Sequence, residues 1–96
     1  MRFLYIVTYD ICEDTRLRRV FKLMKGYGDH LQYSVFRCEL NDRERIELMA
    51  RLTDEIKNDE DQILFFPLGP VGTQREDRIL SLGLPYSPAS LAAIVI

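Results

Sequence analysis

FLYIVTYD, residues Phe3–Asp10, is the stretch of sequence around which the rest of the chain is organised. It is rich in β-branched and aromatic residues, contains neither glycine nor proline, and is too short to form a helix alone, so it predicts a β-strand. Its odd positions are as apolar as its even positions, whereas a strand with one face in water alternates apolar with polar residues. We therefore expect a central strand covered on both faces. Asp10 would lie at its carboxyl end, where open α/β sheets place their sites.

The size and composition are those of one small globular domain. The chain has 96 residues, of which 47% are hydrophobic and 29% charged, as in ordinary globular proteins. No stretch approaches the roughly 18 consecutive apolar residues of a membrane helix. The first residues lack the layout of a signal peptide, so we expect a cytoplasmic protein with no membrane attachment. Cys12 and Cys38 have neither metal-site nor redox spacing and are expected to be free thiols.

The charge is unevenly distributed along the chain. The net charge of −2 argues against a protein that coats nucleic acid, but residues 1–40 carry seven Lys and Arg against five Asp and Glu. Residues 41–96 carry six basic residues against ten acidic ones. This asymmetry allows a local basic face on a protein that is acidic overall.

A first helix is predicted after Asp10, with Asp14 or Thr15 as its N-cap and Gly26 as its end. Its apolar stripe has the spacing i, i+3, i+4 and i+7 and consists of Leu17, Val20, Phe21 and Met24. Its outer face is basic and carries Arg16, Arg18, Arg19, Lys22 and Lys25. Such a face is either a solvated surface or a contact surface for phosphates.

The middle of the chain predicts two short strands and a second helix. Between His30 and Leu40 the apolar alternation changes parity, which indicates two strands that meet near Ser34. His30, the only histidine, is expected at a surface or strand edge rather than in a metal site. Asn41 begins a second helix that runs to about Asn58. Its predicted buried residues are Ile46, Met49, Leu52 and Ile56.

The last part of the chain predicts an edge strand followed by an extension. Residues 62–66 form the strand, which Pro67 is expected to end because proline has no N–H for the ladder. Residues 68–72 would be an exposed linker, and residues 78–82 a further strand. The apolar end, residues 91–96, is expected to fold back on its own sheet or to add a strand to a partner.

This order predicts an α+β fold, the ferredoxin-like β-α-β-β-α-β arrangement, with an extra C-terminal strand. Residues 1–68 would form the domain and residues 69–96 the extension. Two helices cover only one face of a four-stranded sheet, yet the first strand and residues 63–66 are apolar on both faces. We therefore expect a homodimer packed sheet to sheet, whose two-fold axis would supply a second Asp10.

Four motifs resemble the CRISPR-associated protein 2 family. They are Tyr9-Asp10-Ile11, residues 16–20 (RLRRV), residues 25–28 (KGYG) and residues 32–38 (QYSVFRC). The match covers about residues 3–68, in order and at the family's spacing. The resemblance implies a ferredoxin-like homodimer whose C-terminal strand crosses to the partner. It also implies a role in spacer acquisition, as a scaffold that binds CRISPR integrase subunits and DNA.

The resemblance also implies a metal-dependent endonuclease that cleaves RNA or DNA, with Asp10 as its catalytic and metal-binding residue. The expected cofactor is Mg²⁺, with Mn²⁺ as the alternative, since Mg²⁺ takes oxygen ligands and retains several waters. One Asp10 from each protomer would hold the ion. The basic residues of the first helix would contact phosphates, and Tyr9 and Phe36 would line or support the dimer face.

Two alternatives remain open at the level of sequence. Asp10 could simply cap the segment that leads into the first helix, which would leave a scaffold without nuclease activity. The same fold also hosts small-molecule sensors and toxin-type endoribonucleases of the virulence-associated protein D kind. A sensor would lack the basic helix face, and a toxin would act without an integrase partner.

Overall fold

The computed structural model describes residues 1–74 and 80–85, and it has the predicted order of elements. The elements are β1 (Phe3–Asp10), α1 (Asp14–Lys25), β2 (Asp29–Gln32), β3 (Val35–Leu40), α2 (Asp42–Glu55) and β4 (Gln62–Pro70). The strands form one sheet in the order β2-β3-β1-β4, and every neighbouring pair is antiparallel. This is the ferredoxin-like arrangement, and β1 is central, as predicted.

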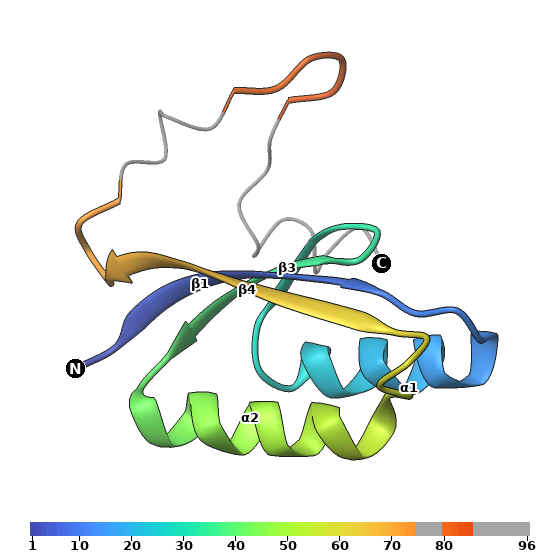
Figure 1. Ribbon diagram of the computed structural model, residues 1–96. Coiled ribbons are helices and arrows are strands. Elements are labelled where there is room, and N and C mark those ends of the chain that lie inside the picture. The colour runs from blue at the N-terminus through green and yellow to red at the C-terminus, as the bar shows by residue number, and fades with distance from the viewer. Residues whose placement is uncertain (75–79, 86–96) are drawn as a thin grey trace.

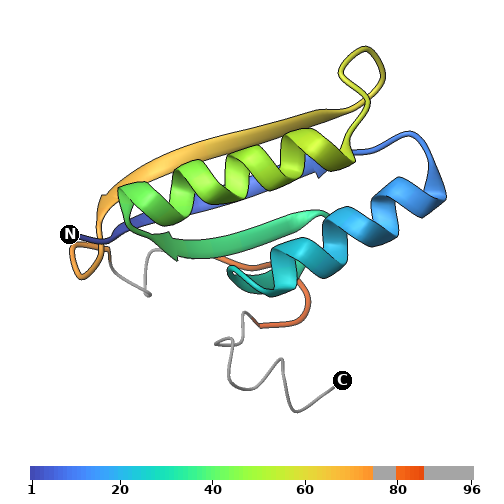
Figure 2. The same cartoon turned by 90° about the horizontal axis from the view of Figure 1, so that it is seen from below.

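Both helices lie on one face of the sheet (Figures 1 and 2). The odd-numbered residues of β1 point toward the helices, and Tyr5, Val7 and Tyr9 are buried in the main core cluster. The strand β3 contributes Phe36 and Cys38 to the same cluster. The thiol of Cys38 is fully buried, and this burial raises its pKa to about 12. Both cysteines are free thiols, as predicted.

The helix α1 ends as predicted but begins one residue earlier. Val20 and Met24 of the predicted stripe are fully buried, and Gly26 is the C-cap. The N-cap is Glu13, rather than Asp14 or Thr15 as expected. Its carboxylate accepts hydrogen bonds from the backbone N–H groups of Thr15 (2.7 Å) and Arg16 (2.9 Å). Glu13 can do this because a longer acid also reaches the first free N–H groups of a helix.

The start of α2 was predicted correctly, and its buried face in part. Asn41 and Glu44 form the expected capping box. The predicted burial of Ile46 was wrong, since 59% of this residue is exposed, whereas Leu48 is fully buried. Leu48 and Leu52 form an i, i+4 pair that shares Leu52 with the predicted stripe. The predicted and the observed apolar stripes of α2 lie less than one turn apart. The helix packs against the sheet with the stripe that contains Leu48, not with the part of the predicted stripe that contains Ile46. The helix ends at Glu55, not at about Asn58.

The β2–β3 hairpin and the edge strand β4 complete the sheet. Tyr33 and Ser34 form the turn between β2 and β3, as the parity change predicted, and Tyr33 has a positive φ of 39°. The strand β4 is an edge strand, also as predicted. The expectation that Pro67 ends it was wrong, because β4 continues to Pro70. The register shifts between Leu4 and Tyr5, and Tyr5 pairs with Pro67, so the proline lies at an irregularity where a ladder N–H is not required.

Within residues 1–74 and 80–85, no helix lies over the face of the sheet opposite α1 and α2 (Figure 1). We call this surface the outer sheet face. Paired residues of antiparallel strands point to the same side, so the register assigns to it six apolar or uncharged residues (Leu4, Ile6, Thr8, Val35, Leu64 and Phe66) and two charged ones (Arg37 and Glu39). Leu64 is 42% exposed and Phe66 is 46% exposed. The helices therefore cover one of the two apolar faces that the sequence indicates.

Two predictions for the C-terminal part lie wholly or partly outside the described residues. Of the strand expected over residues 78–82, residues 80–82 are described and are not in a strand. Leu80, Leu82 and Leu84 are each at least 89% exposed. The apolar end, residues 91–96, lies outside the described residues. In the part of the chain that is described, neither helix is long and apolar enough to cross a membrane.

Candidate active site at the end of strand β1

Asp10 is the last residue of the central strand and is exposed. It pairs across the ladder with Gln62, the first residue of β4. Among the described residues, no hydrogen bond or ion pair occupies its carboxylate. The alternative in which Asp10 caps the following helix does not apply, because Glu13 is the N-cap of α1. The Asp10 carboxylate is therefore available to a ligand.

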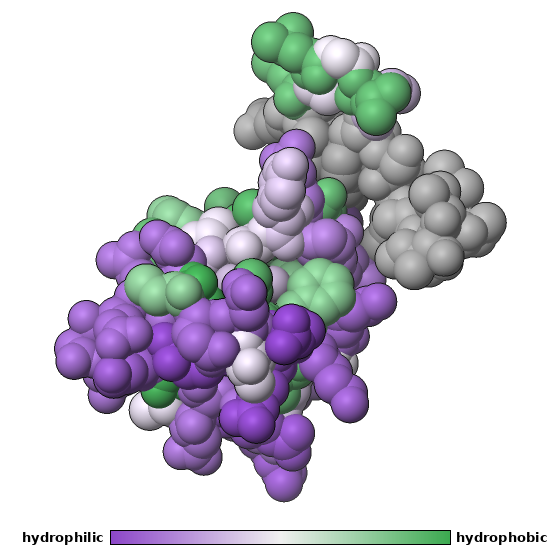
Figure 3. All heavy atoms as spheres, turned by 90° about the vertical axis from the view of Figure 1, so that its right-hand side faces the viewer, coloured by the Kyte–Doolittle hydropathy of each residue, from purple (hydrophilic) through white to green (hydrophobic). Residues whose placement is uncertain are grey.

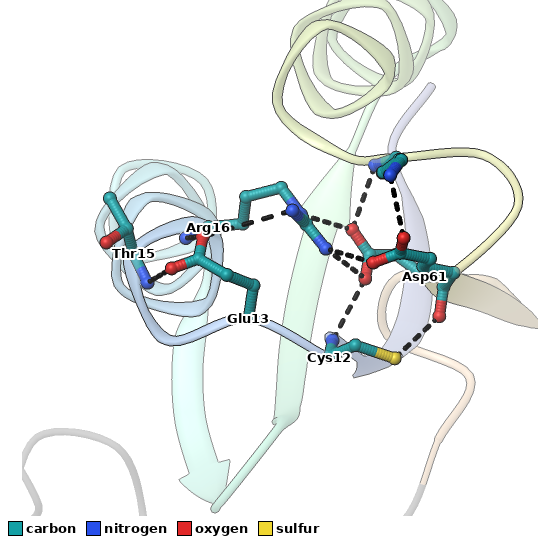
Figure 4. A network of polar contacts seen from close by, with 7 residues as sticks. Cys12, Glu13, Thr15, Arg16 and Asp61 are labelled. Atoms are coloured by element: carbon teal, nitrogen blue, oxygen red, sulfur yellow. Dashed lines mark hydrogen bonds and ion pairs between the residues drawn. The ribbon is translucent and has the colours of Figure 1, made fainter.

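A buried carboxylate, that of Asp61, lies directly beside this strand end (Figure 4). Its oxygens accept hydrogen bonds from the backbone N–H of Cys12 (2.9 Å) and from the backbone N–H of Lys57 (2.8 Å). Arg16 donates to the same carboxylate from Nε (2.8 Å) and from Nη2 (3.3 Å). The thiol of Cys12 donates to the backbone carbonyl of Glu60 (2.8 Å). The segment after β1, the start of α1 and the segment before β4 are thus tied together.

The electrostatics of this network favour the charged form of Asp61. The Arg16 guanidinium holds the pKa of the Asp61 carboxyl well below its usual range, and the Cys12 and Lys57 N–H groups act in the same direction. Burial of the carboxylate opposes this shift. The side chain of Asp61 is 0% exposed and that of Arg16 is 20% exposed. A buried charge of this kind persists only where hydrogen bonds and an opposite charge replace the lost water.

Asp61 is a site residue that the sequence patterns do not indicate, since it falls between the second predicted helix and the strand predicted over residues 62–66. Its partners lie 45 and 49 residues away in sequence, so no local spacing connects them. The available signal was indirect. The first helix carries five cations, and the chain has a run of three acids at residues 59–61 that could pair with one of them.

The predicted nucleic-acid-binding residues separate into two groups. Arg16 pairs with Asp61 and with Glu60 (Nη2 to Oε1, 3.1 Å), so its guanidinium is already engaged. The other four are exposed residues of α1, namely Arg18, Arg19, Lys22 and Lys25. Figure 3 views the end of the molecule where β1 leads into α1, and hydrophilic side chains cover most of this end.

Tyr9 and Phe36 were expected to line or to support the dimer face. They are 6% and 0% exposed, and they belong to the core beneath the helices. Their rings stack with centroids 6.2 Å apart. Burial raises the pKa of the Tyr9 hydroxyl, against the effect of its hydrogen bond with Ser34. Neither residue presents a surface to a second molecule, so of the two expected roles only support from within the core fits their positions.

The residues of one chain offer an incomplete metal site. No group of three or more His, Cys, Asp or Glu side chains could hold a metal ion within residues 1–74 and 80–85. Asp10 is an available hard oxygen ligand, whereas both oxygens of Asp61 and of the Glu13 carboxylate are hydrogen-bonded. Mg²⁺ needs few protein carboxylates because it retains several waters. The donor set fits such an ion if a second copy supplies another Asp10. His30 lies on the edge strand β2, as predicted, and its ring contacts Phe21 and Phe36.

The fold and this strand end define a small ferredoxin-like protein with an available aspartate and a basic helix. Comparison with known proteins specifies the family. The family model described as CRISPR associated protein Cas2 matches residues 1–76. The chain belongs to the Cas2 family and is a CRISPR-associated protein.

Individual relatives agree with this assignment. The chain is 36% identical over 96 residues to the CRISPR-associated endoribonuclease Cas2 of Geobacter sulfurreducens, and the match covers 100% of both chains. It is 46% identical over 68 residues to an endoribonuclease Cas2 of Thermodesulfovibrio yellowstonii, covering 71% of this chain and 75% of that one. The crystal structure of Streptococcus pyogenes Cas2 at pH 6.5 superimposes with a TM-score of 0.71 at 34% identity. It covers 83% of this chain and 99% of that chain.

Proposed function

We propose that this protein is a homodimeric, metal-dependent endonuclease that also serves as a nucleic-acid-binding scaffold in CRISPR adaptation. The observation that carries the nuclease proposal is the Asp10 carboxylate, which is exposed at the end of the central strand and has no partner among the described residues. The names of the relatives support the activity, because they are called CRISPR-associated endoribonucleases.

Apolar surface that the described residues leave exposed supports the proposed dimer. Leu64 and Phe66 are partly exposed on the outer sheet face, and Leu80, Leu82 and Leu84 are almost fully exposed. Exposed apolar surface of this kind marks an interaction site. A second copy packed on the outer sheet face would remove Leu64 and Phe66 from water and would bring a second Asp10 to the same interface.

Each part of the chain has a distinct task in the proposed reaction. A bound Mg²⁺, or Mn²⁺, would polarise the phosphodiester and favour deprotonation of the attacking water. The two Asp10 carboxylates would hold the ion between the protomers. The exposed cations of α1 would bind the neighbouring phosphates without reading sequence. Arg16 would not bind a phosphate, because Asp61 and Glu60 already pair with its guanidinium and balance its charge.

The nuclease proposal is tested with Asp10→Asn, and Asp14→Asn serves as the matched control. Asp14 is an exposed acid in the first turn of α1. Asp10→Asn is expected to abolish Mg²⁺-dependent cleavage of labelled RNA and DNA, while sedimentation shows an unchanged dimer. Asp14→Asn should retain cleavage. Wild-type cleavage rates in the purified Asp10→Asn protein would rule out the proposed site.

Nucleic-acid binding and the scaffold role are tested separately from cleavage. Binding of non-cleaved duplex should weaken steeply with salt, and Lys22→Ala should reduce the slope of log K against log salt by about 0.9. Co-purification with the integrase subunits is expected for the adaptation scaffold. A protein that cleaves RNA alone and never binds the integrase would instead be of the free-standing toxin type.

A further inference from the structure

The Asp61 carboxylate is hydrogen-bonded to the segment that follows Asp10, and Asp61 directly precedes the ladder partner of Asp10. Cys12, whose N–H donates to Asp61 Oδ1 at 2.9 Å, lies two residues after Asp10. Gln62, the ladder partner of Asp10, directly follows Asp61 in the chain. The segment that leaves β1 and the strand that flanks Asp10 are therefore joined through one side chain.

Asp61 cannot itself be a ligand for a metal ion or a substrate. Its side chain is 0% exposed. One oxygen accepts from the Cys12 N–H and from Arg16 Nη2, and the other accepts from Arg16 Nε and from the Lys57 N–H. Both oxygens are thus occupied by donors from the protein. Any contribution of Asp61 to chemistry has to act through the position of other groups.

Arg16 connects the Asp61 carboxylate to the first turn of α1. The guanidinium joins Asp61 through two of its nitrogens, Nε and Nη2, in the side-on arrangement that a planar fork allows. Its backbone N–H lies in the first turn of α1 and donates to the N-cap Glu13 at 2.9 Å. The connection between Asp10 and α1 is therefore fixed at Cys12 by Asp61, and at its far end by the capped helix.

We propose that Asp61, together with Arg16, is a positioning residue for Asp10, which sets the place of the Asp10 carboxylate for the metal ion. This inference rests on the proposed function of Asp10 as a metal ligand. Removal of a group that orients a metal ligand without touching the metal typically lowers metal affinity or activity by about 10- to 100-fold. The requirement is strict here, because a metal site tolerates displacements of only about 0.5 Å and each protomer supplies one carboxylate.

The test compares Asp61→Ala, Asp61→Asn and the wild-type protein in binding of Mn²⁺, measured by electron paramagnetic resonance on the full-length dimer without nucleic acid. Asp61→Ala is expected to weaken Mn²⁺ binding by about 10- to 100-fold. Asp61→Asn should fall between Asp61→Ala and wild type, because its amide oxygen can still accept the Cys12 N–H. In cleavage assays kcat should fall, while KM for RNA should change less than about twofold, since the α1 cations remain.

The control for a general loss of stability is Leu48→Ala. Leu48 is fully buried on α2 and is not among the hydrogen-bond partners of Asp61. Affinities are compared at a temperature where all variants are folded by circular dichroism. Leu48→Ala should bind Mn²⁺ like the wild type, even if its melting temperature is as low as that of Asp61→Ala. If Asp61→Ala does not fold, Asp61→Asn alone carries the comparison.

Two outcomes separate this inference from the proposed function. Wild-type Mn²⁺ affinity in both Asp61 variants, with loss of affinity in Asp10→Asn, would overturn the positioning role and leave the metal site in place. Wild-type affinity in Asp10→Asn would overturn the metal site itself. Equal weakening in Leu48→Ala and in the Asp61 variants would also overturn the positioning role, because the effect would then follow stability alone.

Discussion

Phe66→Ala is expected to weaken self-association of this protein by about 10- to 100-fold. Phe66 lies on the outer sheet face and is 46% exposed in the single chain. Fully burying a phenylalanine side chain stabilises by about 1.5–3 kcal/mol, so covering this remaining 46% contributes about 0.7–1.4 kcal/mol. A two-fold interface contains the residue twice, which gives about 1.4–2.8 kcal/mol per dimer. Each 1.4 kcal/mol is a factor of about ten in Kd.

Sedimentation velocity over a dilution series measures this dissociation constant. Ile46→Ala is the matched control, because Ile46 is an apolar residue that is 59% exposed on α2, a helix on the opposite face of the sheet. Ile46→Ala should leave the dissociation constant unchanged. The reasoning is refuted if the wild-type protein is a monomer at micromolar concentration, or if both variants associate as tightly as the wild type.

Three further predictions concern stability. Leu48→Ala should lower the free energy of unfolding by about 2–5 kcal/mol in urea, whereas Ile46→Ala should change it by less than about 0.5 kcal/mol; equal losses would contradict the observed buried face of α2. Gly28→Ala should cost about 1–3 kcal/mol, because a Cβ there would lie 2.5 Å from the sulfur of Cys38; a wild-type melting temperature would contradict this close approach. The pKa of Asp61 is lower in the folded protein than its ordinary value of 3.8. The contribution of the charged Asp61 to the free energy of unfolding is therefore present above about pH 4, and it is lost as the pH falls through the pKa of Asp61 in the folded protein. Asp61→Asn should consequently flatten the acid side of the stability profile measured by circular dichroism, and an unchanged profile would argue against the ion pair.

The sequence was informative where a pattern is local. Periodicity located both helices and all four strands of the described chain, and the capping box placed the start of α2. The lack of apolar–polar alternation in β1 correctly predicted a central strand. The position of Asp10 followed from the strand that it ends. These features depend on neighbours within a few residues, which a sequence displays directly.

The errors arose where tertiary contacts decide. The apolar residues of α2 allow two stripes that share Leu52, and only packing against the sheet distinguishes Leu48 from Ile46. Pro67 is a reasonable strand terminator, but an irregularity opposite Tyr5 accommodates it. Arg16 was grouped with the solvent-exposed cations because its acidic partner Asp61 lies 45 residues further along the chain. No periodicity indicates a contact of this range.

The connection between α2 and β4 has a consequence for how such a chain can vary in length. The Asp61 carboxylate accepts one hydrogen bond from the backbone N–H of Lys57, which belongs to that connection. It accepts another from the backbone N–H of Cys12, which belongs to the segment after β1. If a residue were added or deleted between Lys57 and Asp61, the Asp61 carboxylate could no longer reach both N–H groups, and one of the two hydrogen bonds would be lost. Among the described residues, the turn after β4 at Val71 and Gly72 has no hydrogen bond to the Asp10 end; the Val71 N–H donates to the carbonyl of Arg2 (2.9 Å), near the opposite end of β1. Peptide tags or natural insertions are therefore better tolerated there than in the short spacer before β4.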